Sequence, residues 1–247
     1  MLLSRMAATV LIGILSANAL AAATQPPLIA IDVGHSLAKP GSVSARGRPE
    51  FEFNRELAMA VERALHLYGF RTLLIGDQGD MTGLTDRTKA AAGADFFLSI
   101  HHDSVQPQYL QPWTIGGTQQ KWTERFSGYS LFVSRSNPNP KKSLACARAI
   151  GEAMRMAGQT PSLHHAEPIK GENRPLADKE NGIYFFDDLV VLKTASSPAV
   201  LVEAGIIVNR HDELELREPA AKRRIAAAIA DGLRRCLYPS ATISGAG

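Results

Sequence analysis

Leu28-Ile29-Ala30-Ile31-Asp32-Val33-Gly34-His35 is a short apolar run that leads directly into a glycine and a histidine. Two later runs have the same form, because residues 96–101 read FFLSIH and residues 199–203 read AVLVE. Segments with apolar residues at helical spacing separate these runs, and such alternation is typical of α/β domains. We therefore predict a single α/β domain with a mostly parallel, twisted sheet and helices on both faces.

The same patterns predict where the other elements begin and end. Strands are expected at residues 28–33, 70–75, 96–100, 129–133 and 199–203, with a further short strand at 189–192. Helices are expected from Glu50 to a stop at Gly69, and over residues 84–92, 143–156 and 220–237. Residues 36–49, 104–128 and 159–182 are rich in Gly, Pro or polar residues and are predicted to be loops.

The N-terminal residues have the order of charge and hydropathy that is typical of a secretory signal peptide. Arg5 is followed by an apolar stretch from Met6 to Leu20 and then by small residues up to Ala23. The stretch is short for a membrane span, so an uncleaved anchor is the less favoured alternative. We expect a signal peptide over residues 1–23, one domain over residues 24–247 with a frayed tail after about residue 239, and no transmembrane segment in the mature chain.

Composition narrows the class of protein. Apolar residues make up 45% of the chain, which is enough for a large core, and the net charge of +3 is too small to indicate a nucleic-acid partner. Export would permit a disulfide between Cys146 and Cys236, but two buried free thiols fit the sequence equally well. Two cysteines alone do not make a thiolate metal site.

Polar side chains follow three of the predicted strands. His35, His101 and Glu203 stand at strand ends, and Glu50 opens the first helix. Ligands of open α/β sheets bind outside the carboxyl ends of the strands, so these side chains are candidates for one site. Two imidazoles and a carboxylate leave an open position on zinc, and a second carboxylate can accept a proton from water and pass it on. The alternative is that both histidines are structural and that Glu203 is a buried ion-pair partner.

Three strings resemble one enzyme family: IDVGHS at residues 31–36, SIHHD at 99–103 and VLVEAGIIVN at 200–209. They are similar, in the same order, to motifs of the zinc-dependent N-acetylmuramoyl-L-alanine amidases of bacterial cell-wall remodelling. The resemblance runs from about Ile29 to Leu237. It implies that His35, Glu50 and His101 bind one zinc ion per chain and that Glu203 is the catalytic residue. The implied substrate is peptidoglycan, cleaved at the amide bond between N-acetylmuramic acid and L-alanine.

Two assignments in this match have competitors. Glu52 lies two residues after Glu50, but Glu50 places Asn54 four residues on, as in the resembled family. His102 follows His101, and we expect it to face away or to lie at the rim of the cleft because adjacent strand residues face opposite sides. The chain also departs from the commonest family pattern at Ser36 and at Ile206-Ile207. These departures affect subfamily and substrate preference more than chemistry.

Two segments are candidates for controlling access to the site. Residues 104–128 contain Trp113 and are predicted to form a substrate-binding lip, although a loop packed on its own aromatics is the alternative. In some members of the resembled family an inserted helix blocks the zinc until a protein activator displaces it. Prolines and glycines in this segment argue against such a helix here. Arg174 is a candidate partner for a stem-peptide carboxylate. We expect His164 and His165 to be solvated, as neighbouring histidines on a loop usually are, and a second metal site formed by them is the less favoured alternative.

Two other functions remain open from the sequence. One is a zinc carboxypeptidase acting on stem peptides, and the other is a catalytically silent peptidoglycan-binding or regulatory protein on the same fold. The complete set of four candidate site residues argues against the silent protein. The absence of wall-binding repeats from this sequence favours the periplasm as location, with secretion as second choice.

Overall fold

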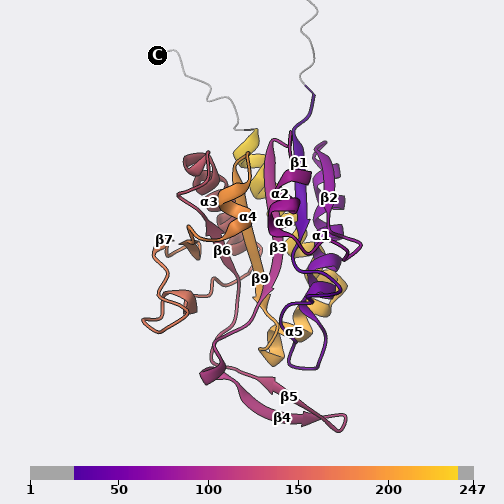
Figure 1. Ribbon diagram of the computed structural model, residues 1–247, viewed down its shortest axis with the longest axis vertical. Helices are drawn as coiled ribbons and strands as arrows, with labels where there is room; N and C mark the ends of the chain where they lie inside the picture. The colour runs from indigo at the N-terminus through magenta and orange to yellow at the C-terminus, as the bar shows by residue number, and fades with distance from the viewer. Residues whose placement is uncertain (1–24, 239–247) are drawn as a thin grey trace, which may run out of the picture.

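The computed structural model describes residues 25–238, which form one seven-stranded sheet with helices on both faces (Figure 1). The strand order is β2-β1-β3-β9-β6-β8-β7. The strands are β1 (Leu28–Val33), β2 (Arg71–Ile75), β3 (Phe96–Asp103), β6 (Ser130–Val133), β7 (Leu176–Asp178), β8 (Ile183–Phe185) and β9 (Ala199–Ile206). The pairs β1–β2, β1–β3, β3–β9 and β6–β8 are parallel, whereas β6–β9 and β7–β8 are antiparallel. The predicted mostly parallel α/β fold is confirmed.

Two layers of helices cover the sheet. One layer contains α1 (Glu50–Leu67), α3 (Pro140–Met156) and α6 (Pro219–Leu237), and the other contains α2 (Leu84–Ala90) and α4 (Val190–Thr194). A further helix, α5 (Arg210–Arg217), follows β9. Among the described residues, no helix combines the length and apolarity needed to cross a membrane. The signal peptide expected at residues 1–23 and the tail expected after about residue 239 lie outside the described residues.

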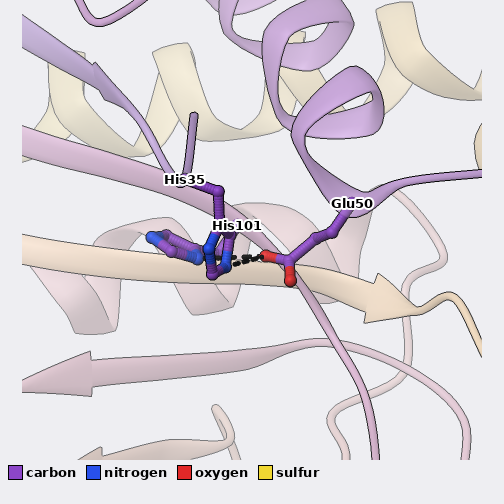
Figure 2. Close-up of side chains that lie close together, drawn as sticks. All are labelled: His35, Glu50 and His101. Atoms are coloured by element: carbon purple, nitrogen blue, oxygen red, sulfur yellow. Dashed lines mark hydrogen bonds and ion pairs between the residues drawn. The ribbon is translucent and has the colours of Figure 1, made fainter. Parts of the chain in front are cut away.

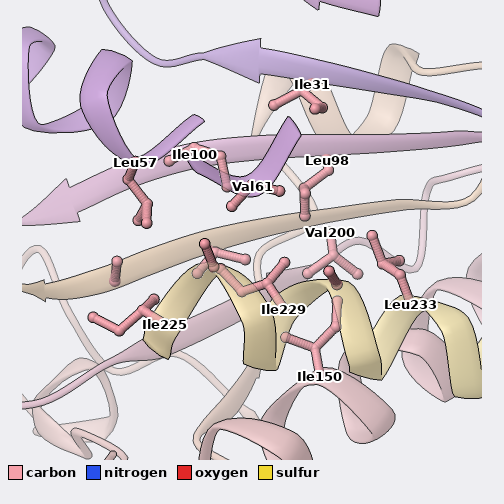
Figure 3. Close-up of a cluster of buried hydrophobic side chains, with 14 of the residues drawn as sticks. Ile31, Leu57, Val61, Leu98, Ile100, Ile150, Val200, Ile225, Ile229 and Leu233 are labelled. Atoms are coloured by element: carbon pink, nitrogen blue, oxygen red, sulfur yellow. The ribbon is translucent and has the colours of Figure 1, made fainter. Parts of the chain in front are cut away.

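The larger core lies between the sheet and the layer of α1, α3 and α6 (Figure 3). Ile31 of β1, Leu98 of β3 and Val200 of β9 point into it and meet Leu57 of α1 and Ile229 of α6. Each of these side chains is almost fully buried, and full burial of such a side chain stabilises the fold by about 1.5–3 kcal/mol. Because successive strand residues face opposite sides, this register turns the alternate residues toward α2 and α4.

Several predictions of local structure were wrong. Residues 104–128 contain a short 3-10 helix, η1 (Pro107–Tyr109), and an antiparallel hairpin of β4 (Gln111–Ile115) and β5 (Thr118–Trp122), which projects from one end of the domain. The predicted strand at 189–192 is the start of α4, because four consecutive apolar residues fit a helical turn as well as a strand. Residues 159–182 contain the 3-10 helix η2 (His164–Ala166) and β7.

Helix α5 was also missed, because its sequence RHDELELR has a weak apolar pattern. Its first turn is capped by Asn209, whose side chain accepts hydrogen bonds from the backbone N–H groups of His211 and Asp212. Glu213 is fully buried on its inner side and pairs with Arg46 at 2.5 Å. The helix is therefore held by a cap and a buried ion pair rather than by an apolar face alone.

A disulfide joins Cys146 of α3 to Cys236 of α6. The two helices approach closely, because a Cβ on Gly232 would lie 2.5 Å from the Cα of Ile150. Of the two alternatives that fit the sequence, the structure contains the bridge rather than two free thiols. It fastens the C-terminal helix to α3 on the face of the sheet opposite α2 and α4.

Replacing both cysteines by alanine should lower the free energy of unfolding by about 2–4 kcal/mol, because the bridge restricts an unfolded chain between residues 90 apart. Urea unfolding followed by far-UV circular dichroism measures this loss. The unmodified protein in a reducing buffer is the matched control and should lose a similar amount. Equal unfolding midpoints for the oxidised protein and the double variant would contradict the prediction.

Candidate metal centre

His35, Glu50 and His101 converge at the carboxyl ends of β1 and β3 (Figure 2). Glu50 Oε1 lies 2.9 Å from His35 Nε2 and 3.1 Å from His101 Nδ1. One ligand atom from each residue lies within 4.8 Å of the other two, which is compatible with a shared metal ion. The structure thus brings together the three predicted ligands, which come from the turn after β1, the first residue of α1 and β3.

The turn that carries His35 is held by a buried arginine that no local sequence pattern indicates. His35 has a φ of 69°, a left-handed conformation that is uncommon for a residue other than glycine. Arg87 of α2 donates hydrogen bonds to the backbone oxygens of Val33, His35 and Met81. It also pairs with Asp32 Oδ1 at 2.6 Å. These contacts fix the backbone from which the His35 imidazole projects.

Two glycines leave room for the site. A Cβ on Gly34 would lie 2.3 Å from His101 Nε2, so the imidazole packs directly against the backbone at this position. A Cβ on Gly41 would lie 2.4 Å from Glu50 Oε2 and 2.6 Å from His35 Cδ2, and Gly41 also has a φ of 79°. Any larger residue at either position would displace a candidate ligand.

Glu50 is buried and held from several sides. Its Oε2 accepts a hydrogen bond from Ser42 N at 3.0 Å, and its Oε1 accepts one from Asn54 Nδ2 at 3.1 Å. Burial alone would raise the pKa of Glu50, but hydrogen bonds from His101 and His35 outweigh it and hold this pKa well below its usual range. Glu50 is therefore an ionised carboxylate, as a metal ligand must be.

The competing residue Glu52 lies outside the site. Its side chain is 51% exposed and pairs with Arg48 at 2.7 Å. His102 faces the opposite side of the sheet from His101, where its Nδ1 lies 2.8 Å from Asn54 Oδ1. Burial lowers the pKa of His102 to about 3, so it is neutral. The expectation that His102 faces away is confirmed, and of the two glutamates Glu50 reaches the histidines.

Glu203 stands directly opposite His101 in the register of β3 and β9. Its Oε2 is shielded from solvent and has no hydrogen-bond partner among the described residues. Burial raises the pKa of this carboxyl well above its usual range, and the negative charges of Asp103 and Glu50 raise it further. Glu203 therefore holds a proton more readily than an ordinary glutamate.

Two adjoining pockets meet at the candidate site, because His101, Leu189 and Leu201 line both. One pocket includes His35, and the other includes Glu203 and Arg174. The Arg174 guanidinium lies 3.9 Å from the centre of the Phe186 ring, and its buried Nε has no hydrogen-bond partner among the described residues. Arg174 thus lines the same pocket as Glu203.

Trp113 lies elsewhere, on the β4–β5 hairpin. Its Nε1 donates a hydrogen bond to the backbone oxygen of Ala45 at 2.8 Å, and its ring lies 6.4 Å from that of Trp122. Arg210 stacks on Trp122 at 3.5 Å. The aromatic side chains of this segment therefore pack on one another and on an arginine, and Trp113 is not part of either pocket that His101 lines.

His164 and His165 are buried, so the expectation that they are solvated was wrong. They approach Asp103 at the end of β3, where each Nε2 lies close to Asp103 Oδ2. Loop composition did not reveal this, because the burial arises from the packing of residues 159–182 against the sheet. The one local indication in the sequence was Asp103, an aspartate at the end of an apolar strand, where polar partners are expected.

The arrangement as a whole is that of a hydrolytic α/β domain with a candidate metal centre at the carboxyl ends of its strands. Comparison with known proteins agrees with this class. The family model described as N-acetylmuramoyl-L-alanine amidase matches residues 29–235 of the chain. The chain therefore belongs to the N-acetylmuramoyl-L-alanine amidase family.

Relatives and solved structures are similar over most of the chain. The chain is 26% identical over 219 residues to the amidase AmiA of Salmonella typhimurium, covering 83% of this chain and 74% of that protein. The solved catalytic domain of the amidase CwlV from Bacillus (Paenibacillus) polymyxa var. colistinus has a TM-score of 0.65 and 25% identity, covering 86% of this chain and 98% of that chain. The amidase Ami1 of Mycobacterium smegmatis has a TM-score of 0.67 at 20% identity, covering 86% and 97%, which supports the fold.

Proposed function

We propose that this chain hydrolyses the amide bond between N-acetylmuramic acid and L-alanine in peptidoglycan. The observation that carries the proposal is the convergence of His35, Glu50 and His101 beside Glu203. Membership of the amidase family supplies the substrate class. Water is the proposed nucleophile, so no covalent enzyme intermediate is implied.

The proposed metal is one zinc ion at the centre of His35, Glu50 and His101. Two imidazoles and a carboxylate suit zinc at a hydrolytic site that keeps an open position. Hydrogen bonds from Asn54 and Ser42 orient Glu50, as outer-shell contacts do at metal centres. When bound, zinc would supply Lewis-acid chemistry to the reaction.

Glu203 is the proposed acid–base residue. Its raised pKa makes the Glu203 carboxylate a stronger base than that of an ordinary glutamate, which suits a group that accepts a proton and then returns it. The group can take a proton from the attacking water and return it to the leaving nitrogen. β9 lies in the sheet beside β3 and holds Glu203 next to His101, and both residues line one pocket.

Arg174 is the proposed partner of a stem-peptide carboxylate. A guanidinium that stacks on the Phe186 ring and lines the pocket that contains Glu203 suits a carboxylate ligand. Trp113 was proposed from the sequence as a second substrate contact. Its packing against Trp122 and Ala45 favours the alternative that the hairpin stacks its own aromatics.

The proposed location is the periplasm, with secretion as second choice. The disulfide between Cys146 and Cys236 is compatible with an oxidising compartment. A protein activator is compatible with the family, because the CwlD amidase of Clostridioides difficile was solved in complex with the GerS lipoprotein. In this chain residues 104–128 form η1 and a hairpin rather than a long helix.

Substitution of Glu50 tests the metal centre. The variant Glu50→Gln should lose one equivalent of zinc per chain after dialysis, because a neutral amide replaces an anionic ligand. The matched control Glu52→Gln should keep the zinc content of the unmodified protein, since Glu52 lies on the surface. Elemental analysis of both dialysed proteins gives the answer. Equal zinc contents for the two variants would remove Glu50 from the site.

Product analysis tests the reaction. Mass spectrometry of digested sacculi should show free peptides with N-terminal L-alanine and glycan strands with unsubstituted muramic acid. Glu203→Gln should lower turnover by roughly 10²–10⁴-fold while zinc stays bound, because a proton carrier is lost and no ligand is removed. Release of single terminal amino acids would instead identify a carboxypeptidase. Intact sacculi, with zinc bound to the unmodified protein, would contradict the proposed activity of the chain on its own.

Substitution of Arg174 tests substrate recognition. Arg174→Gln should lower kcat/KM by roughly 10- to 100-fold on muropeptides with free stem-peptide carboxylates, because a charge-assisted hydrogen bond is lost. The effect should vanish on the same muropeptides with amidated carboxylates. An equal loss on both substrates would show that Arg174 supports the pocket without binding a carboxylate.

A further inference from the structure

A second cluster of metal-binding side chains lies at the end of β3, outside the centre described above. Asp103 is the last residue of β3, and His164 and His165 begin η2. Asp103 Oδ2 lies 3.3 Å from His164 Nε2 and 2.8 Å from His165 Nε2. The three candidate ligand atoms all lie within 4.8 Å of one another.

The geometry of this cluster repeats that of the first centre. In each, two imidazole nitrogens converge on a single carboxylate oxygen, at 2.9 and 3.1 Å around Glu50 and at 2.8 and 3.3 Å around Asp103. The donor set of two histidines and one carboxylate is also the same. All members of the second cluster are buried, whereas His35 of the first centre is partly exposed.

The other ring nitrogens of the cluster are held by outer contacts. His165 Nδ1 lies 2.8 Å from Glu172 Oε2, and His164 Nδ1 lies 2.9 Å from Ser162 Oγ. Metal-binding histidines bond their second nitrogen to a carboxylate or another polar group in this way, which fixes the ring and its tautomer. Asp103 Oδ1 accepts a hydrogen bond from Ser104 N, so Oδ2 is the oxygen that faces both rings.

Protonation of a histidine does not give every buried polar atom of this cluster a partner. An imidazolium on His165 would donate to Asp103 and Glu172, since both of its nitrogens lie 2.8 Å from a carboxylate oxygen. That arrangement leaves His164 Nε2 without a hydrogen-bond partner. Water cannot supply one, because the His164 side chain is only 2% exposed. A cation shared by both Nε2 atoms and Asp103 Oδ2 would satisfy all three ligands together.

We propose that Asp103, His164 and His165 bind a second divalent transition-metal ion, of which zinc suits the donor set best. Imidazole and carboxylate ligands favour zinc over calcium or magnesium, which prefer oxygen ligands alone. The charges of Asp103 and Glu172 offset that of a divalent ion. The ion joins residues 159–182 to the end of β3 and so stabilises the wall of the pocket that contains His165, Arg174 and Glu203. This inference does not depend on the proposed amidase function.

Zinc binding by the complete chain tests the second site. The unmodified protein, freed of metal and dialysed against zinc alone, should hold two equivalents per chain. His164→Gln and Glu50→Gln should each hold one, and the double variant none. His211→Gln is the matched control and should hold two, because His211 is 83% exposed on α5. One equivalent in both the unmodified protein and His164→Gln would overturn the proposal.

A measurement without substitutions covers the case in which the His164 variant fails to fold. Anomalous diffraction at the zinc edge, from zinc-soaked crystals of the unmodified protein, should show a peak between Asp103 and the two imidazoles. A peak only at His35, Glu50 and His101 would refute the second site and leave the amidase proposal intact. A peak only at Asp103, His164 and His165 would support the second site and contradict the proposed zinc centre of the amidase. The failure of one proposal can therefore be told from the failure of the other.

Discussion

Arg87 is buried against the end of β1, and three backbone oxygens and the Asp32 carboxylate all accept hydrogen bonds from its guanidinium. Asp32 in turn accepts a hydrogen bond from Ser99 Oγ at 2.6 Å, which links β1 to β3. Loss of one partner from a buried pair of this kind costs about 3–5 kcal/mol, because an unpaired charge remains. The left-handed turn at His35 depends on this network. The same contacts fix the position of His35 relative to Glu50, and the candidate metal centre depends on that position.

The register of β3 against β9 determines what the site contains besides its ligands. His101 pairs with Glu203, and the pairing then shifts so that Asp103 lies opposite Ile206. Such bulges are frequent beside active sites because they redirect side chains. Strand alternation places His101 and Glu203 on the face toward α2 and α4, while His102 is buried on the other. Three consecutive residues of β3 thereby have three roles: His101 belongs to the first centre, His102 is buried in the core, and Asp103 belongs to the second cluster.

The sequence predicts the fold and the candidate site best where neighbouring residues along the chain determine the structure. Apolar runs that end in His35, His101 and Glu203 mark strand ends, and parallel strands bring their ends together. The β4–β5 hairpin was not predictable in this way, because its strands are polar and mostly exposed and are stabilised by pairing with each other. The second cluster joins Asp103 to His165 across 62 residues, and no local pattern encodes that contact. Arg87 was missed for the same reason, since its partners lie on another element.

The distribution of charge explains why two cation sites would suit this fold. Glu50, Glu203 and Asp103 all lie at one end of β3 and β9, and the charges of Asp103 and Glu50 raise the pKa of Glu203. Carboxylates this close together repel one another strongly in a poorly solvated site. A divalent ion at His35, Glu50 and His101 and another at Asp103, His164 and His165 would compensate Glu50 and Asp103 separately. The negative charges of both carboxylates act on Glu203, which belongs to neither group of candidate ligands, so its carboxyl group is left free to exchange a proton.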